Sequence, residues 1–372
     1  MKLRDFKNSK ERASYLEKKL TISLSHCKKI GTDLDPLAHC ENRIGSIVLP
    51  LGVAGPMNII GQYVQGEYYV PLATTEGALV ASVNRGAAAT FKSGITTSVE
   101  KKGVTRGPVL KTKTIGEAQQ VEKWINNNIH QLKNETEKKS AHIHLIDVIT
   151  KRVGMYLYIR FSFDTDKAMG MNMATRATES IGEYIAKHTH SFMISIAGNF
   201  DIDKKPAWLN ALYGRGYSVH AESIVSPELT KKILKTTPQK ITELWKIKCL
   251  IGSALSGSIG FNAHHANIVA AFYAATGQDL AHVVEGSLGM TVMDILDDGS
   301  LYISVQMPCV MMGIVGGGTN LTTQTEARNI TKGDSPEALS EIVASAVLSG
   351  ELSLLASLSE GTLVKAHTEL GR

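Results

Sequence analysis

Alternation of apolar and polar positions marks the middle of the chain. In the stretch 155–163 the apolar side chains recur at every second position, which is the period of a half-buried β-strand. One side of this strand consists of Leu157, Ile159, Phe161 and Phe163, and the other of Tyr156, Tyr158 and Arg160. Similar patterns predict further strands at 109–110, 142–149 and 192–197, and helices at 116–132 and 169–187. The predicted order of these elements is β-α-β-β-α-β.

This order is that of a ferredoxin-like split unit, so we expect a small domain at residues 108–195, inserted into a larger one. Residues 1–45 predict a small helical N-terminal region, because apolar positions such as Tyr15 and Leu20 recur at roughly helical spacing. The large domain would comprise residues 46–107 and 196–372 and would end in helix. The expected fold class is therefore α/β, in the α+β sense.

The longest uncharged stretch runs from Cys249 to Gln278 and is about long enough to cross a bilayer. It carries polar side chains that lipid would penalise, namely Ser253, Ser256, Ser258, Asn262, His264, His265 and Asn267. We therefore expect one buried helix here and no membrane partner. The start of the chain, 1–6, is charged and lacks the apolar core of a signal peptide, which predicts a cytoplasmic protein.

The composition indicates a globular protein and says little about which class of function it has. Hydrophobic residues make up 43% and charged residues 20% of the 372 positions, which is typical of globular proteins. The net charge of +5 comes from scattered lysines and the aromatic content is 6%, so nothing indicates a nucleic-acid partner. The four cysteines form no CxxC pair and no zinc-finger spacing, which predicts reduced thiols and no metal site.

Four short segments place reactive side chains beside permissive backbone. They carry Glu76 in 74–77, Lys204 and Lys205 in 203–206, Asp279 in 277–279, and His367 in 365–367. Each alone has a simpler interpretation, such as helix capping, a solvated surface or a turn. No GxGxxG follows a strand, so a Rossmann dinucleotide site is not indicated. The glycines at 316–318 could cradle a phosphate, although a triple glycine more often marks a turn.

Taken together, these segments resemble the 3-hydroxy-3-methylglutaryl-coenzyme A (HMG-CoA) reductase family, from about Glu41 almost to the end of the chain. The matching pieces are ENRIG (41–45), GVAGP (52–56), PLATTEGALVASVNRG (71–86), TRGP (105–108), DKAMGMNM (166–173), GN (198–199), DKKPA (203–207), GRG (214–216), KTT (235–237), GSALSGSIGFNAHHANIV (252–269), GQD (277–279), GGGTN (316–320) and LVKAH (363–367). The segment DKAMGMNM is similar to the class I form of eukaryotes and archaea, which makes mevalonate with NADPH.

The resemblance implies a fold and an assembly. A large coenzyme A-binding domain would surround a long central helix, and the inserted domain at 108–195 would bind NADP. The substrate would be HMG-CoA. The chain would form a homodimer or homotetramer with active sites between subunits, and it would lack the membrane domain of the eukaryotic members.

The resemblance also implies a catalytic role for each of four residues. Hydride reduction of a thioester creates an oxyanion, and Lys204 would stabilise it. His367 would protonate the coenzyme A thiolate. Glu76 would protonate the aldehyde oxygen in the second reduction. Asp279 would lie between Lys204 and Glu76 and tune both.

Binding roles follow from the same resemblance. Arg106 and Asn199 would contact the acid end of the substrate or the reaction centre nearby. The residues that would support this polar pocket are Asp203, Lys205 and Lys248, and Asn267 would support the catalytic network. The cofactor contacts would be Met171, Asn172 and Gly317, with Arg372 placed to meet the 2′-phosphate of NADPH.

Three other functions remain open on the sequence. The first is an NADH-preferring relative that oxidises mevalonate. The second is a non-catalytic coenzyme A-binding homologue, which the presence of Glu76, Lys204, Asp279 and His367 disfavours. The third is acyl transfer, for which Cys309 is the nearest candidate nucleophile, although a buried structural cysteine is the simpler interpretation.

Overall fold

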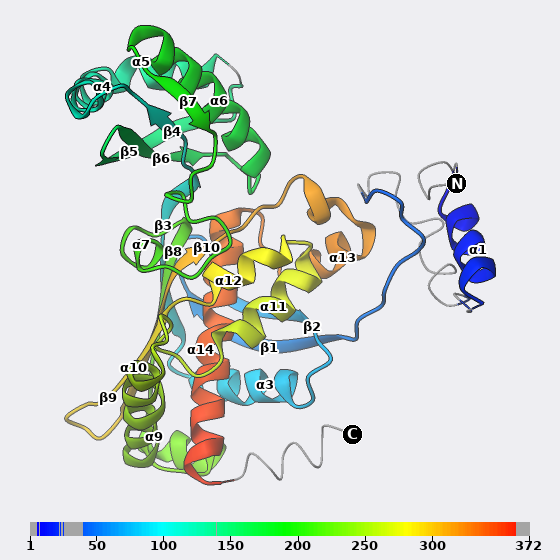
Figure 1. Cartoon of the computed structure of the whole chain (residues 1–372). Coiled ribbons are helices and arrows are strands. Elements are labelled where there is room, and N and C mark those ends of the chain that lie inside the picture. Colours follow the sequence, from blue (N-terminus) through cyan, green and yellow to red (C-terminus); the bar gives the residue numbers. More distant parts are fainter. Residues whose placement is uncertain are drawn as a thin grey trace.

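The structure is a computed structural model that describes residues 6, 8–21, 23, 25, 40–138 and 140–361. It has a small α/β unit at one end, a large body below it, and the helix α1 (Ser9–Leu20) to one side (Figure 1). This is the mixed α/β fold that the sequence predicts. The helix predicted in the N-terminal region is confirmed by α1.

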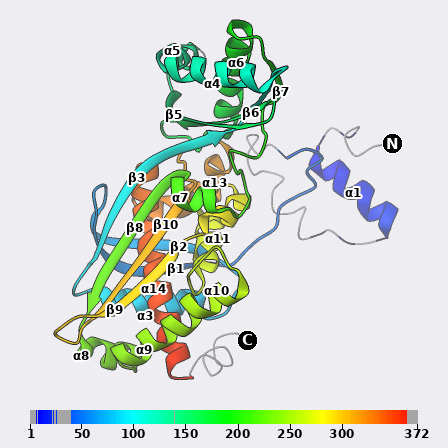
Figure 2. The same cartoon turned by 60° about the vertical axis from the view of Figure 1, so that its left-hand side comes forward.

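One long strand, β3 (Ile95–Arg106), connects the two parts of the molecule. Its first two-thirds pair antiparallel with β8 (Gly216–Val225), and its last residues, Val104 to Arg106, pair antiparallel with β6 (Tyr156–Asp164). The ten strands of the described residues therefore form one continuous sheet. Seven of them follow the path β7 (Phe192–Ser195), β4 (Val109–Lys111), β6, β3, β8, β10 (Leu301–Val310) and β9 (Met290–Ile295). Off this path, β5 (His144–Val153) pairs with β6, β1 (Leu51–Ile60) pairs with β3, and β2 (Gln65–Ala73) pairs with β1. Figure 2 shows β3 rising from the body into the small unit.

The small unit has the predicted order of elements, except that two helices replace the first predicted helix. Its members are β4 (Val109–Lys111), α4 (Ile115–Asn127), α5 (Ile129–Glu137), β5 (His144–Val153), β6, α6 (Met171–His188) and β7 (Phe192–Ser195). The strands pair antiparallel in the order β7-β4-β6-β5, which is the strand order of a split β-α-β unit. The single helix predicted at 116–132 is wrong, because Asn128 leaves helical geometry at φ −120° and divides it into α4 and α5.

The alternation predicted for β6 is confirmed on its apolar side. Leu157, Ile159 and Phe161 are fully buried in the core of the small unit. Arg160, on the other side, is also fully buried, which the sequence pattern does not show. Its guanidinium donates to the backbone oxygen of Gly214 at 2.8 Å, because the chain after β7 folds back over this face.

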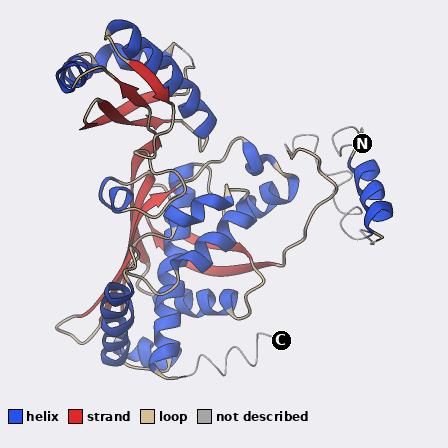
Figure 3. Ribbon diagram, in the orientation of Figure 1, coloured by secondary structure: helices blue, strands red, loops and turns tan. Residues whose placement is uncertain are grey.

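The large body is built on the rest of the sheet and a central helix. Its strands are β1 (Leu51–Ile60), β2 (Gln65–Ala73), β8, β9 (Met290–Ile295) and β10 (Leu301–Val310). Its helical elements are α3 (Leu79–Thr90), α7 (Trp208–Tyr213), α8 (Pro227–Leu229), η2 (Thr230–Leu234), α9 (Pro238–Trp245), η3 (Lys246–Gly252), α10 (Ser253–Ser256), α11 (His265–Thr276), η4 (Leu280–His282), α12 (Val283–Gly286), η5 (Gly317–Asn320), α13 (Thr322–Ile330) and α14 (Pro336–Ser359). Figure 3 shows these helices gathered against the sheet.

The central helix is α14, which packs against α3, α11 and the sheet. In the described part of the chain it alone has the length and apolar composition to cross a membrane, yet 83% of its apolar window is buried inside the structure. Close packing with α3 depends on Gly86, because a Cβ there would lie 1.9 Å from the Ser349 carbonyl oxygen. The structure thus contains a long central helix, and it is a core element.

The long buried helix predicted at 249–278 is wrong. The stretch contains the end of η3, then α10, a break, and α11. Gly257 adopts φ +70° after α10, and the Ser258 amide closes the helix end by donating to the Ser253 oxygen at 2.9 Å. Asn262 then donates to the backbone oxygens of Ser287 and Gly289. Ser258 and Asn262 therefore lie in the break between the two helices, whereas Ser253 and Ser256 lie in α10 and His265 and Asn267 lie in α11.

Candidate active site

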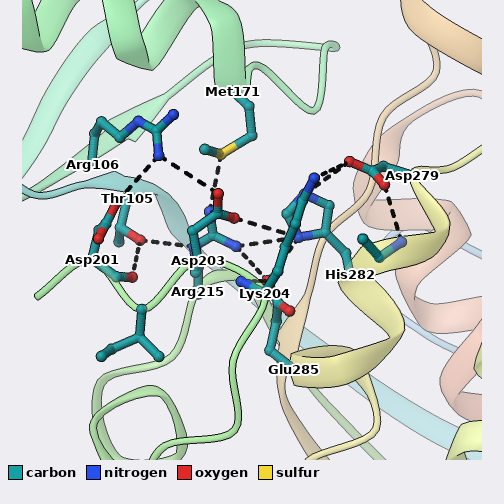
Figure 4. A network of polar contacts seen from close by, with 12 residues as sticks. Thr105, Arg106, Met171, Asp201, Asp203, Lys204, Arg215, Asp279, His282 and Glu285 are labelled. Carbon is teal, nitrogen blue, oxygen red and sulfur yellow. Dashed lines mark hydrogen bonds and ion pairs between the residues drawn. The ribbon is translucent and has the colours of Figure 1, made fainter. Parts of the chain in front are cut away.

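Lys204 and Asp279 form an ion pair beside the junction of the two parts. Lys204 Nζ lies 2.7 Å from Asp279 Oδ2, and the two side chains are 37% and 35% exposed (Figure 4). Asp279 also caps η4, since its Oδ1 accepts from the Ala281 amide at 3.0 Å. Burial alone would raise the pKa of the Asp279 carboxyl, but the hydrogen bonds from Lys204 and Ala281 outweigh it and lower the pKa. Asp279 is therefore an anion at neutral pH.

A buried carboxylate, Glu285 on α12, lies beneath this pair. Its Oε1 accepts from the Lys204 backbone amide at 3.3 Å and from the guanidinium of Arg215, and it lies 2.7 Å from His282 Nδ1. Glu285, Arg215 and His282 are all fully buried. Arg215 also donates to Asp203 Oδ1 at 3.0 Å. The two residues Asp203 and Lys204 are thus fixed from below by one ionic network (Figure 4).

The segment that carries Lys204 is strained. Asn199, Ile202 and Lys204 have φ values of 63°, 47° and 56°, which non-glycine residues rarely adopt. Several groups hold this backbone in place. Asn210 Nδ2 donates to the Ile202 backbone oxygen at 2.9 Å. Thr105 Oγ1 donates to the Asp201 backbone oxygen at 2.8 Å. A strained backbone conformation persists only where the surrounding contacts hold it in place.

A cavity of about 640 Å³ opens beside the ion pair. Among its lining residues are the predicted site residues Arg106, Asp203, Lys204, Asp279, Met171, Asn172 and Gly317. The structure therefore brings the predicted reacting lysine and three predicted cofactor residues to one space, from three separate segments of the chain.

Two features of this cavity suit an anionic ligand. The helix α6 begins at Met171, and its N-cap residue Gly170 has no side chain that could cap it. The first backbone amides of α6 therefore make no hydrogen bond to a capping side chain and can donate to an anion. The glycine segment 316–318 packs against the Asp279 segment, because a Cβ on Gly277 would lie 2.2 Å from the Gly318 oxygen. Only glycine at these positions allows the two backbones to approach so closely.

Glu76 lies at a different cavity, of about 400 Å³. Asn267 Nδ2 donates to Glu76 Oε1 at 3.1 Å, and Glu76 is exposed. Within the described residues, no hydrogen bond or ion pair joins Glu76 to Lys204 or Asp279. In the described part of one chain Asp279 contacts Lys204, and its placement between Lys204 and Glu76 stays a prediction.

The other predicted residues are distributed around these cavities. Lys248 and Asn267 line a third, open cavity of about 1050 Å³. Lys205 is exposed and donates to the Asp203 backbone oxygen at 3.0 Å, and Asn199 is exposed. Arg106 Nη1 lies 3.6 Å from Asp203 Oδ2. His367 and Arg372 lie outside the described residues.

Arg215, His282 and Glu285 belong to the site but are not predicted from the sequence. Arg215 lies in one of the matched pieces, GRG, and Asp279, His282 and Glu285 follow one another at intervals of three residues. No local pattern marks Arg215, His282 or Glu285 as buried. Asp203, His282 and Glu285 have possible metal-ligand atoms within 4.8 Å of one another. Arg215 donates to both carboxylates, so a cation already balances their charge, and we assign no metal to this cluster.

Cys309 does not have the environment of a nucleophile. It is fully buried, and its Sγ lies 3.2 Å from the Asn210 backbone oxygen. Burial raises the pKa of its thiol to about 12, so the reactive thiolate is not formed at neutral pH. The structure favours the simpler interpretation of Cys309 as a core residue.

The fold is shared with a solved enzyme structure. The class II 3-hydroxy-3-methylglutaryl-CoA reductase from Streptococcus pneumoniae, bound to NADPH in open conformations, superposes with a TM-score of 0.70 at 18% sequence identity. The match covers 95% of this chain and 97% of that one. At this level of identity the similarity concerns the fold.

Sequence relatives are much closer. The 3-hydroxy-3-methylglutaryl-coenzyme A reductase of Methanothermobacter thermautotrophicus is 45% identical over 368 residues, which are 97% of this chain and 92% of the relative. The reductase 2 of Dictyostelium discoideum is 43% identical over 350 residues, which are 90% of this chain and 66% of the relative. A family profile described as hydroxymethylglutaryl-coenzyme A reductase matches residues 8–372. The chain therefore belongs to the hydroxymethylglutaryl-coenzyme A reductase family.

Proposed function

We propose that this protein reduces HMG-CoA to mevalonate and coenzyme A in two hydride transfers from NADPH. The observation that carries the proposal is the Lys204–Asp279 ion pair of 2.7 Å, at the cavity that Met171, Asn172 and Gly317 also line. An ammonium group beside this cavity can stabilise the oxyanion that forms when a carbonyl is reduced. The membership of the family, at 45% identity over nearly the whole chain, supports the same reaction.

Lys204 would stabilise the oxyanion that forms when the thioester carbonyl, and later the aldehyde, is reduced. A fixed cation accelerates this step because it is already oriented where charge develops. Asp279 holds the ammonium group in place, and its lowered pKa keeps it charged at neutral pH. The strained backbone at Lys204 is consistent with a side chain whose direction matters.

The cofactor cavity fits a phosphate-bearing dinucleotide. Its walls include the uncapped start of α6, with Met171 and Asn172, and the glycine segment at 316–318. When bound, NADPH would supply the hydride. We infer that residues 108–195 form the domain that binds it, and that Arg372 would add a cation for the 2′-phosphate.

Glu76 would act as the acid for the second reduction. Asn267 orients its carboxyl through the 3.1 Å hydrogen bond. His367, near the end of the chain, would protonate the departing thiolate. Arg106 and Asn199 would contact the acid end of the substrate, and Asp203, Lys205 and Lys248 would support that pocket.

The complete site would form between two copies of the chain. In one chain Glu76 and Lys204 line separate cavities, so a partner subunit would bring the acid of one copy to the lysine of the other. The exposed apolar residues Ile247, Ile251 and Leu255 on η3 and α10, 55% to 87% exposed, offer a surface for such an assembly. We therefore infer a homodimer or a homotetramer.

We assign the chain to class I. The segment DKAMGMNM favours this form, and so does the identity of 43% to a eukaryotic relative, against 18% to the class II structure. The class I assignment predicts a preference for NADPH. An NADH-preferring, mevalonate-oxidising enzyme is the remaining alternative, and cofactor preference separates the two.

The test is oxidation of NADPH, followed by its absorbance, with HMG-CoA as substrate and with NADH and no-substrate controls. Substrate-dependent oxidation that prefers NADPH is expected, and mevalonate and free thiol should accumulate. A clear preference for NADH would favour the degradative alternative. Absence of oxidation, in folded protein that binds coenzyme A, would favour a non-catalytic homologue.

A further inference from the structure

Lys204 is held at both ends by one short segment of the chain. Asp279 binds its ammonium group at 2.7 Å, and Glu285, six residues later, accepts a hydrogen bond from its backbone amide at 3.3 Å. The segment that links these two acids comprises η4 and α12. The position of the amine relative to its own backbone is therefore set by two carboxylates with a fixed separation.

The backbone contact matters because Lys204 is in the left-handed region, with φ 56°. A residue with a Cβ avoids this region in the absence of compensating contacts, because the Cβ lies too close to the following carbonyl oxygen. If the amide were released, the residue would relax toward an ordinary conformation. The side chain would then leave the cavity in a different direction.

Glu285 has the surroundings of a structural anchor. It is fully buried, and the buried guanidinium of Arg215 balances its charge. Arg215 also binds Asp203 at 3.0 Å, so the residue that precedes Lys204 belongs to the same network. His282 Nδ1 lies 2.7 Å from Glu285 Oε1, the same atom that accepts from Arg215 and from the Lys204 amide. His282 Nε2 lies 3.6 Å from Asp279 Oδ2. His282 therefore connects Glu285, which binds the Lys204 backbone amide, to Asp279, which binds the Lys204 ammonium group.

We propose that Glu285 is a positioning residue that acts through Lys204, by holding the Lys204 amide in the left-handed conformation that directs the ammonium group to Asp279 and the cavity. The expected effect on kcat rests on the proposed function. The position of the Lys204 amine does not, because it can be followed in the absence of substrate. Glu285 itself would touch neither substrate nor cofactor.

The chain offers a matched control in Glu341 on α14. This carboxylate is also fully buried and also accepts backbone hydrogen bonds, from the amides of Gln62, Tyr63 and Val64 at 2.9 to 3.1 Å. Among the described residues, the hydrogen-bond partners of its carboxylate are Gln62, Tyr63 and Val64, and Ser345 Oγ donates to its backbone oxygen; none of these residues lines the Lys204 cavity. Glu341→Gln therefore reports what the loss of a buried carboxylate does to stability alone.

The experiment compares Glu285→Gln, Glu285→Asp and Glu341→Gln in the full chain. Glu285→Gln removes the charge, and Glu285→Asp keeps the charge for Arg215 but withdraws it by one methylene from the Lys204 amide. We expect both Glu285 variants to lower kcat at least about tenfold, with KM for HMG-CoA changed less than about threefold. Glu341→Gln should lower the denaturation midpoint while kcat of the folded protein stays within about twofold.

A second readout follows the lysine directly, without substrate. Reductive methylation with ¹³C-formaldehyde labels the lysine amines, and the Lys204→Arg variant identifies the Lys204 resonance. This resonance should shift in the Glu285 variants and stay unchanged in Glu341→Gln. If Glu285→Gln does not fold, Glu285→Asp decides by the same two readouts.

An unchanged Lys204 resonance with kcat within about twofold of wild type in a folded Glu285 variant would overturn the proposal. Equal loss of kcat in Glu341→Gln would overturn it too, because a general loss of stability would then explain the effect. If the wild-type protein shows no HMG-CoA-dependent oxidation, the proposed function fails, and the resonance alone decides whether Glu285 positions Lys204.

Discussion

Asn267, in the first turn of α11, donates a hydrogen bond of 3.1 Å to the Oε1 atom of Glu76, which precedes α3. The two residues are 191 positions apart, and their contact depends on how α11 begins. The buried carboxylate of Glu351 on α14 accepts from the amides of Ala263 and His264 at 2.8 and 2.7 Å. The central helix thus fixes the turn that aims Asn267 at the proposed acid.

Replacement of Asn267 tests this arrangement. Asn267→Ala removes one hydrogen bond to Glu76, so we expect kcat for mevaldehyde reduction to fall about tenfold, since one such bond is worth about 1 kcal/mol or slightly more. Asn134→Ala, on the exposed side of α5, is the matched control. Rates are measured separately with HMG-CoA and with mevaldehyde. A variant that slows only the thioester reduction would contradict the role of Glu76 as the acid for the aldehyde.

Removal of the Lys204 amine tests the oxyanion assignment. Lys204→Ala removes the ammonium group beside Asp279, and we expect kcat to fall roughly 10²- to 10³-fold, as when one donor to an oxyanion is lost. Circular dichroism should remain that of the wild type, because the side chain is over one-third exposed. Lys231→Ala, an exposed lysine on η2, serves as the control. Normal turnover of folded Lys204→Ala protein would refute the assignment.

Acid stability should depend on His265. Burial is the main cause that lowers the pKa of His265, to about 4, from an ordinary value of 6.5. Below pH 6.5 the unfolded chain takes up a proton that the folded protein excludes, so stability is full above that pH and declines as pH falls toward about 4. The loss over this window is of order 3 kcal/mol. His265→Gln should flatten the dependence of the urea midpoint on pH, and the exposed His130→Gln should not. Parallel profiles for wild type and His265→Gln would exclude this cause.

Any side chain at Gly86 should disrupt the packing of α3 against α14. A Cβ there would lie 1.9 Å from the backbone oxygen of Ser349, and backbone in two packed helices cannot move aside cheaply. Gly86→Ala should therefore destabilise the protein by about 1–3 kcal/mol or more. Gly116→Ala on α4 meets nothing closer than 3.8 Å and should be neutral or slightly stabilising. Chemical denaturation of both variants measures the difference, and equal midpoints would contradict the packing argument.

The elements of the small unit could be predicted from sequence because their signals are local. The alternation through Leu157, Ile159 and Phe161 follows from strand geometry, and those residues are buried as expected. The break at Asn128 was not predictable, because a polar residue within a polar helix has no distinct pattern. Domain boundaries and the roles of the site residues remain predictions.

The sequence by itself determined the family, the order of the small unit and the segments that carry Glu76, Lys204 and Asp279, because motif identity and side-chain period are properties of neighbouring residues. Only the tertiary structure decided which long segment is the central helix. Glu341 and Glu351 interrupt the apolar pattern of α14, and they can be buried only because distant turns supply backbone amides to them. Likewise, an Arg or Glu in sequence is equally compatible with a solvated surface and a buried ion pair. Arg215 and Glu285 acquire their role beneath Lys204 because the fold removes both from water and places them against each other.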